Sequence, residues 1–219
     1  MKIKAIILGS TGMVGEGVLH ECLIDKRVES VLVINRKPCE VKNTKLNEII
    51  LTDFNKIETI KDQLIGFNAC YFCMGVSSVG MQIDVYKTIT YNLTLNIAKQ
   101  LLQLNKEMTF CYVSGSGTDS SEKGKLKWAR IKGKTENDLL KLSFKAAYMF
   151  RPGYIQPTKG LKHTYKIYKV LAPFYPLFKL LFNKYVCTLE EVGKAMINVT
   201  LSGAKIKVLE CVDIHKAAK

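Results

Sequence analysis

The chain has 219 residues, of which 47% are hydrophobic, so it is long enough to bury the core of one domain. No linker, low-complexity segment or internal repeat divides it, which excludes a solenoid and predicts a single domain over residues 1–219. The formal net charge is +14: residues 1–110 hold 13 Lys and Arg against 11 Asp and Glu, and residues 111–219 hold 20 against 8, so the halves carry +2 and +12. Such a basic surface suits nucleic acid, an anionic membrane or an anionic small molecule.

The N-terminus and the cysteines bear on the compartment. The apolar run after Lys4 is too short for a signal-peptide core, so we expect the chain to begin at its fold. The seven cysteines are odd in number and lie mostly in apolar runs, as expected of reduced thiols in a cytoplasmic protein. Cys70 and Cys73 fall on opposite faces of one predicted strand, which excludes a disulfide between them. Without paired His or Cys spacing, we expect no metal site.

Short, continuous runs rich in Val and Ile alternate with helical patterns along the chain. Runs of this kind are typical of parallel strands buried on both faces, and they occur at about 3–8, 30–35, 47–51, 69–74, 108–113 and 146–150.

Three apolar stripes at helical spacing predict helices between these strands. The first runs from Val14 to Leu23, the second from Leu93 to Leu104, and the third covers roughly 125–143. Near the end, a capping box at residues 188–191 predicts a helix that Gly203 closes, followed by a strand at about 206–212.

The alternation of strand and helix defines the expected fold class. We predict an α/β, Rossmann-like doubly wound parallel sheet with helices on both faces and a small C-terminal elaboration on the substrate side. In such sheets the ligand binds at the carboxyl ends of the strands.

A glycine-rich turn joins the first strand to the first helix. Gly9 permits the turn, Gly12 lets the backbone approach a pyrophosphate, and Gly15 lets the helix pack against the strand. The N-terminus of the helix adds unpaired N–H groups and a positive dipole. The predicted cradle for a dinucleotide consists of Gly9, Ser10, Thr11, Gly12, Met13, Val14 and Gly15.

The end of the second strand carries Asn35, Arg36 and Lys37 in place of the acidic residue that binds the ribose hydroxyls of NAD. A guanidinium at this position can grip a 2′-phosphate through charge-assisted hydrogen bonds, whereas a carboxylate would repel it. We therefore expect Asn35 and Arg36 to contact the cofactor and the cofactor to be NADP (NADPH).

The motif GSTGMVG resembles the short-chain dehydrogenase/reductase superfamily, and later segments narrow the likeness to its atypical branch, with NmrA-like and Tat-interacting-protein-like oxidoreductases. The resemblance runs nearly end to end. The segments that carry it are INRK, LTDF with Asp53 and Phe54, CYFCMGVSS, MTFCYVSGSG, KGKTEN and FRPG, of which KGKTE with FRPG is the most specific.

The resemblance implies roles for further residues. Asp53 and Phe54 would lie beside the adenine, and Gly75 and Val76 beside a ribose. Asn92 would stand at the structural asparagine position. The residues expected to flank the nicotinamide are Pro152, Gly153 and Tyr154.

The same resemblance implies a catalytic group of Ser114, Trp128 and Lys132. Ser116 is an alternative to Ser114, because Gly115 interrupts the usual run. Lys132 matches the lysine of the Tyr-x-x-x-Lys pair, where it binds the nicotinamide ribose and lowers the pKa of the phenol.

The tyrosine position of this pair is held by Trp128, whose indole N–H cannot act as a proton shuttle. Three explanations follow. Another acid serves, with Tyr154 and Tyr86 as candidates, or the chemistry needs no phenol, as in hydride transfer to a quinone. In the third explanation the protein binds NADPH without turning it over, as a sensor or regulator.

Residues 154–190 are expected to form a basic, aromatic insertion on the substrate side. Between 161 and 186 lysines alternate with Tyr, Phe and Leu, and prolines interrupt the pattern. A core-packing insertion, a substrate lid and a helix on an anionic membrane surface would all have this composition. We expect no nucleic-acid binding, since no nucleic-acid motif accompanies the charge. The sequence does not set the oligomeric state.

These observations together predict an NADP(H)-dependent oxidoreductase of the atypical short-chain type. Its partner is expected to be a small-molecule substrate, carbonyl-like or quinone-like. The competing hypothesis is a catalytically silent NADPH-binding regulatory protein.

Overall fold

A computed structural model describes residues 2–163, 173 and 175–219. Its centre is a seven-stranded sheet in the order β3-β2-β1-β4-β5-β6-β9, in which all neighbouring strands are parallel. The predicted Rossmann-like α/β fold is thereby confirmed. The strands are β1 (Ile3–Leu8), β2 (Val28–Asn35), β3 (Leu46–Ile50), β4 (Ala69–Phe72), β5 (Thr109–Val113), β6 (Ala146–Arg151) and β9 (Val208–Glu210).

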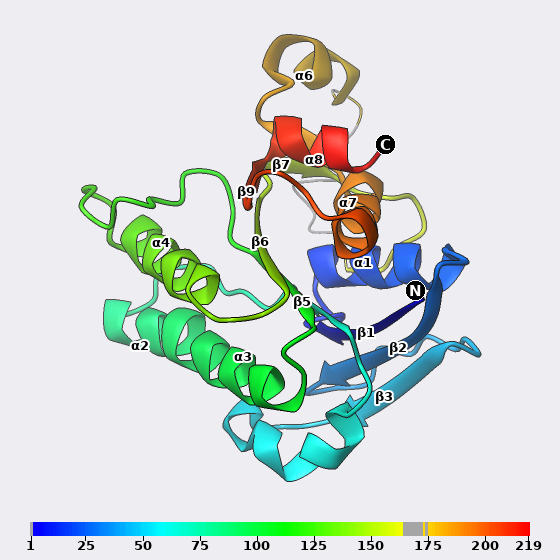
Figure 1. Cartoon of the computed structure of the whole chain (residues 1–219). Helices are drawn as coiled ribbons and strands as arrows, with labels where there is room; N and C mark the ends of the chain where they lie inside the picture. Colours follow the sequence, from blue (N-terminus) through cyan, green and yellow to red (C-terminus); the bar gives the residue numbers. More distant parts are fainter. Residues whose placement is uncertain (1, 164–172, 174) are drawn as a thin grey trace.

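Helices cover both faces of this sheet (Figure 1). One face carries α2 (Ile83–Lys87), α3 (Leu93–Leu104) and α4 (Lys127–Leu140), and the 3-10 helix η1 (Phe54–Leu64) packs against α3. The other face carries α1 (Met13–Ile24), α7 (Leu189–Ser202) and α8 (Cys211–Ala217). A π-helical segment, η2 (Thr88–Asn92), joins α2 to α3.

The core consists of two apolar layers, one on each face of the sheet. Because side chains alternate along a strand, β1 supplies both layers: Ala5 and Ile7 pack with α1 and α7, and Ile6 and Leu8 pack with α3 and η1. This burial of both faces explains the unalternated apolar runs in the sequence.

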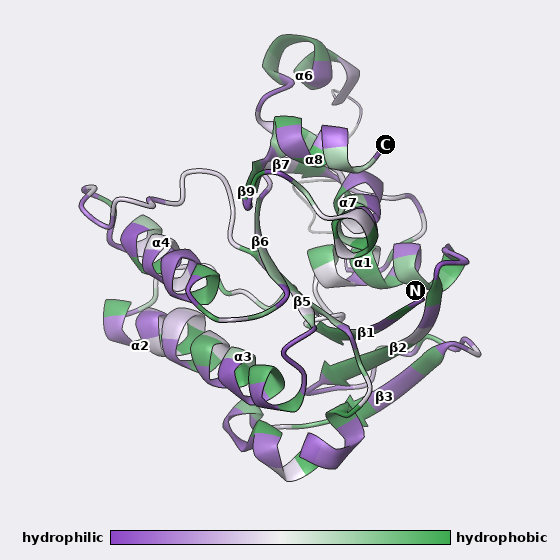
Figure 2. Ribbon diagram, in the orientation of Figure 1, coloured by the Kyte–Doolittle hydropathy of each residue, from purple (hydrophilic) through white to green (hydrophobic). Residues whose placement is uncertain are grey.

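Two of the predicted strands form, but one differs from the prediction in its burial and the other in its length. β3 is the edge strand and its residues are partly or fully exposed, not buried on both faces, and Figure 2 shows hydrophilic positions along it. The last strand is only three residues long and gives way to α8 at Cys211. The Asp213 carboxylate accepts a hydrogen bond from the Glu210 N–H at 3.3 Å, an N-terminal cap that begins a helix where the pattern predicted a strand.

The segment 154–190 begins with β7 (Tyr154–Gln156) and contains β8 (Val186–Thr188), which pairs with β7 in a separate two-stranded parallel sheet. The helix α6 (Tyr175–Phe182) lies between them in the chain. Strands of three residues are too short for a sequence pattern to predict. Much of the arm at 161–186, namely 164–172 and 174, lies outside the described residues.

The capping box predicted at Thr188 is confirmed. The Thr188 hydroxyl accepts a hydrogen bond from the Glu191 N–H at 3.0 Å, and the Glu191 carboxylate accepts one from the Thr188 N–H at 2.8 Å. Gly203, with φ of 73°, ends α7 as expected.

Candidate functional site

The glycine turn leaves the start of α1 without a side-chain cap. Gly9 has φ of 87°, and a Cβ on Gly15 would lie 2.1 Å from the Gly9 carbonyl oxygen, so the helix packs directly on the turn. The first helical hydrogen bond runs from the Glu16 N–H to Gly12 O at 2.8 Å. The N–H groups of residues 13–15 therefore precede the first helical bond, as an anion site requires.

A cleft of about 390 Å³ opens at this turn, at the carboxyl ends of β1, β2, β4 and β5. This volume is in the range of small-ligand sites. The predicted cofactor residues that line it are Gly9, Thr11, Gly12, Asn35, Arg36, Asp53, Phe54, Gly75, Val76 and Lys132. Ser10, Met13, Val14 and Gly15 are not part of this lining, and the side chains of Met13 and Val14 pack in the apolar layer under α1.

The end of β2 is fixed from behind the cleft. The Ser10 hydroxyl donates to the Asn35 side-chain oxygen at 2.9 Å, and the Asn35 amide donates to Glu48 at 2.8 Å. The same Glu48 oxygen accepts the Cys39 N–H at 2.9 Å. Asn35 therefore holds the turn and strand together, and the adjacent Arg36 is exposed on the cleft.

The adenine end of the predicted site is built by η1. The Asp53 carboxylate caps this helix by accepting the Asn55 N–H at 3.0 Å, and Phe54 is buried behind it. Both residues line the cleft, as the resemblance implies.

At the opposite end of the cleft Lys132 projects from α4. Its ammonium donates to the backbone carbonyl of Ser114, and burial lowers the pKa of Lys132 to about 8, an effect that the negative charge of Glu136 opposes. The neighbouring lining residue Tyr112 is buried, and burial raises the pKa of its phenol well above the ordinary value.

The hydroxyl of Ser114 is engaged by other groups of the protein. It donates to the buried Glu136 carboxylate and lies 3.2 Å from the Phe150 carbonyl. Alternation along β5 places Ser114 on the same side of the strand as Phe110 and Tyr112, and Tyr112 lines the cleft. The Ser114 hydroxyl thus already has protein partners, and the choice between Ser114 and Ser116 as the catalytic serine stays a prediction.

Glu136 and Arg151 form a buried ion pair beneath the site. The Glu136 side chain is 0% exposed and that of Arg151 is 10% exposed. The Arg151 Nε donates to both carboxylate oxygens at 3.0 and 3.1 Å, and its Nη2 donates to Glu136 and Ser120. This ion pair joins the KGKTE segment to the FRPG segment, a contact that the sequence did not predict.

Trp128 lies beside the loop after β5, not on the cleft. A Cβ on Gly117 would come within 3.4 Å of the Trp128 ring, so the indole packs against this turn. Of the alternative acids, Tyr86 is buried, and burial raises the pKa of its phenol, while a hydrogen bond with Thr90 opposes the rise. Thr90 itself lines the cleft.

Pro152, Gly153 and Tyr154 lie outside the lining. The Pro152 carbonyl accepts the Ser116 N–H at 2.9 Å, and Gly153 packs on Tyr185, where a Cβ would come within 2.2 Å of the carbonyl oxygen. The Tyr154 ring lies 5.8 Å from that of Phe178, so it packs toward α6. The flanking of a nicotinamide by these residues stays a prediction.

Asn92, expected at the structural asparagine position, is exposed and does not line the cleft. It ends the π-helical segment η2, whose wider turn changes which side chains face inward. Further cleft residues, which the sequence did not indicate, come from η2, from strand ends and the loops after them, and from the starts of η1 and α3: Ile34, Thr52, Asn55, Cys73, Met74, Ile89, Thr90, Leu93 and Tyr112.

The residues present fit a nicotinamide dinucleotide. The start of α1 has no side-chain cap and offers its N–H groups to phosphates. The close contact between Gly15 and Gly9 leaves no room for a side chain at position 15. Within the described part of the chain, no three His, Cys, Asp or Glu side chains gather as metal ligands would.

Curated proteins and solved structures resemble this chain, although no family model matches it. Protein FMP52, mitochondrial, from Debaryomyces hansenii is 27% identical over 203 residues, covering 90% of this chain and 87% of that protein. Protein HTATIP2 from Rattus norvegicus is 24% identical over 158 residues, covering 71% and 64%.

The ADP-L-glycero-D-manno-heptose-6-epimerase of Helicobacter pylori superposes with a TM-score of 0.69 at 14% identity, covering 97% of this chain and 80% of the epimerase. A short chain dehydrogenase family protein from Francisella tularensis gives a TM-score of 0.63 at 13% identity, covering 93% of each chain. Both structures bear out the predicted Rossmann-like fold, and one of these similar chains is named as a short chain dehydrogenase family protein. A third neighbour, MoeE5 with UDP-glucose and NAD, gives a TM-score of 0.66 at 13% identity, covering 96% and 79%.

The prediction of a cytoplasmic protein is contradicted by these comparisons. Several curated relatives, from Debaryomyces hansenii, Meyerozyma guilliermondii and Kluyveromyces lactis, are named as mitochondrial proteins. Reduced thiols do not distinguish one reducing compartment from another, which is why the cysteine pattern misled.

Proposed function

We propose that this chain binds NADP(H) in the cleft and transfers hydride between the cofactor and a small carbonyl-like or quinone-like substrate. The observation that carries the proposal is one continuous cleft onto which the glycine turn, Arg36 and Lys132 all open. The names of the curated relatives favour a mitochondrial setting for this activity.

Three groups on the cleft would each bind a different part of the cofactor. The start of α1 would bind the pyrophosphate, the Arg36 guanidinium the 2′-phosphate, and residues at the Lys132 end the nicotinamide riboside. Glu48 does not compete for the 2′ position, because its carboxylate is engaged by Asn35 and Cys39 and does not line the cleft.

NADPH would supply the hydride when bound. With no phenol at position 128, Lys132 is the group suited to deliver the proton to a substrate oxygen, since its pKa of about 8 lies near neutral pH. The Ser114 carbonyl positions its ammonium, and solvent restores the proton after each turnover.

The hypothesis of a silent NADPH sensor gains no support from the comparisons, in which the solved neighbours are named as an epimerase and a dehydrogenase family protein. A substitution of Trp128 by Tyr tests it directly. If that variant reduces substrates that the natural chain leaves untouched, the sensor hypothesis is favoured.

Cofactor choice is tested by titrating NADPH and NADH into three proteins: the natural chain, Arg36→Ala and the control Lys37→Ala. Loss of a charged hydrogen-bond partner costs about 1.5–3 kcal/mol, so Arg36→Ala should weaken NADPH roughly 10- to 100-fold and leave NADH nearly unchanged. Lys37 is exposed and does not line the cleft, so its variant should match the natural chain. Equal losses for both cofactors would refute the NADP assignment.

Catalysis is tested by following NADPH oxidation with a panel of aldehydes, ketones and quinones. The proposal is supported if the natural chain oxidises NADPH with any compound of the panel and the Lys132→Met variant does not. Tight NADPH binding with no turnover across the panel would contradict the oxidoreductase assignment and leave the binding assignment intact.

A further inference from the structure

The helix α6 is unusual in this structure because none of its residues is buried. Its sequence, YPLFKLLF, is nevertheless strongly apolar. Short helices in a folded domain normally bury their apolar side, so a core-packing role does not account for α6. In Figure 1 the helix protrudes from the end of the molecule beyond α8, and Figure 2 shows it largely hydrophobic.

One side of α6 packs on the body of the protein, and the other side is exposed. Tyr175 and Phe178, at i and i+3, face the body of the protein, where their rings lie 6.5 and 5.8 Å from the ring of Tyr154. Leu177, Leu180 and Leu181 fall on the opposite side at i, i+3 and i+4.

The outward leucines, Phe182 at the end of the helix and Tyr185 in the turn after it form an exposed apolar surface, which we call the α6 face. It consists of Leu177 (51% exposed), Leu180 (80%), Leu181 (61%), Phe182 (53%) and Tyr185 (60%). Large apolar side chains gathered in this way mark a site of interaction, whereas single exposed ones do not.

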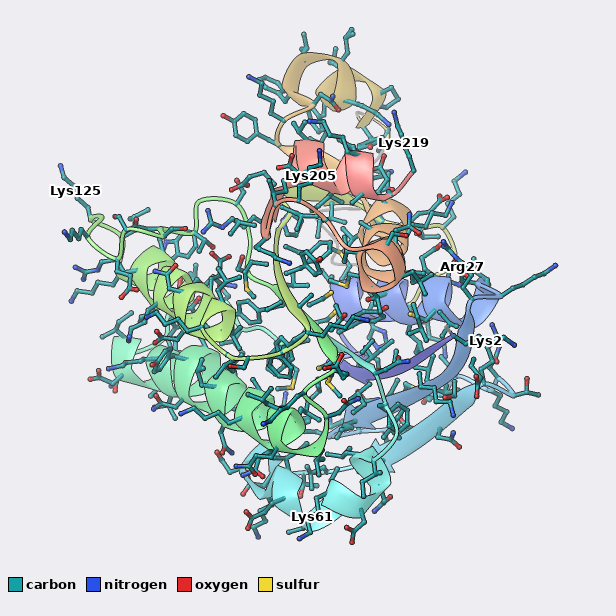
Figure 3. The ribbon with its side chains drawn as sticks, viewed as in Figure 1. Lys2, Arg27, Lys61, Lys125, Lys205 and Lys219 are labelled. Atoms are coloured by element: carbon teal, nitrogen blue, oxygen red, sulfur yellow. The ribbon has the colours of Figure 1, made fainter. Side chains whose placement is uncertain are left out.

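The charge near the α6 face is positive. Lys184 is exposed next to Tyr185, whereas Lys179 lies over the Tyr175 ring and 3.8 Å from Glu191. The sequence from 161 to 186 contains no Asp or Glu. Lys205 and Lys219 lie on the same end of the molecule, near α8 (Figure 3). A second copy of a chain with net charge +14 would bring like charges together, whereas an anionic lipid surface would neutralise them.

We propose that the α6 face docks on an anionic membrane surface, with its leucines and aromatic rings among the acyl chains and its lysines at the headgroups. An apolar helix face flanked by lysines is the arrangement that binds at a bilayer interface without crossing it. None of the helices in the described part of the chain is long and apolar enough to span a membrane. This surface role is independent of the proposed hydride transfer.

Vesicle flotation with the full chain tests the proposal. Vesicles of phosphatidylcholine alone are compared with vesicles that contain about one third phosphatidylserine, at about 0.05 M and about 0.5 M salt. We expect binding to the anionic vesicles at low salt and its weakening at high salt, because salt screens the lysines.

Two double variants separate the α6 face from charge alone. Leu180→Ser with Leu181→Ser should weaken binding by about tenfold or more, since each loses several buried carbons. The matched control is Ile24→Ser with Ile65→Ser, which removes apolar side chains exposed at 61% and 63% on other elements, and it should bind as the natural chain does. Thermal melting checks that both variants are folded, as expected for exposed positions.

The other outcomes overturn the proposal. Absence of binding to anionic vesicles at low salt removes it, and equal binding by both double variants would show that charge acts without the helix. If sedimentation instead shows dimers that the Leu180/Leu181 variant abolishes, and no vesicle binding, the α6 face is an interface between two copies.

Discussion

Replacing Glu136 by Gln should destabilise the fold more than any exposed charge substitution. The change removes the charge from a carboxylate that is 0% exposed and that accepts hydrogen bonds from Arg151 and Ser114. Arg151 would then keep Glu210, at 3.3 Å and 45% exposed, as its carboxylate partner in the described structure. Breaking a buried ion pair by neutralising one side costs about 3–5 kcal/mol, because the other charge stays buried.

The assay is urea and thermal unfolding followed by circular dichroism. For a chain of this size about 1 kcal/mol shifts Tm by about 2–4 °C, so Glu136→Gln should lower Tm by roughly 6–20 °C. The control Glu190→Gln makes the same chemical change in an exposed i,i+4 pair with Lys194, where we expect a loss below about 1 kcal/mol.

The double variant Glu136→Met with Arg151→Met provides a second check. Removing both charges leaves no buried ion without a partner, so this variant should be more stable than Glu136→Gln alone. A loss below about 1 kcal/mol for Glu136→Gln, or a double variant less stable than the single one, would refute the reasoning.

Three further predictions concern the cleft and one helix. Gly15→Ala should abolish dinucleotide binding, because its Cβ would lie 2.1 Å from Gly9 O. The control Lys37→Ala, at an exposed position outside the cleft, should bind normally, and titration with NADPH decides. In the proposed reaction Lys132 donates a proton as the ammonium, so the rate of substrate reduction should be constant below a pH of about 8 and fall above it. The rate of the reverse oxidation should rise over the same pH range. Lys132→Arg should remove this change from the pH–rate profile. Thr188→Ala should cost about 1 kcal/mol of unfolding free energy, measured in urea, because α7 loses its cap; no measurable loss would show that the capping box is not stabilising.

The features predicted correctly from the sequence are those that local chemistry determines. A glycine turn between strand and helix needs neighbours only a few residues away, and so does the basic residue at the end of β2, which is why Gly12 and Arg36 could be placed on one cleft. The core strands were predictable for the same reason, since burial on both faces produces a continuous apolar run.

The features that were missed depend on contacts between distant segments. Glu48 and Asn35 are 13 residues apart in the sequence, and Glu136 and Arg151 are 15 apart. No spacing rule predicts either contact. The hydrogen bond from the Ser114 hydroxyl to Glu136 is a contact of the same kind, because 22 residues separate the two and the resemblance alone did not indicate it.

The π-helical segment η2 fixes the number of residues between α2 and α3. Taking one residue out of 88–92 would restore a regular helix and rotate everything before it by about 100° relative to α3. Tyr86, which is 1% exposed, would then leave its buried position. The number of residues between Tyr86 and Leu93 is therefore fixed by geometry, and relatives that keep this cleft should differ there by substitution and not by insertion or deletion.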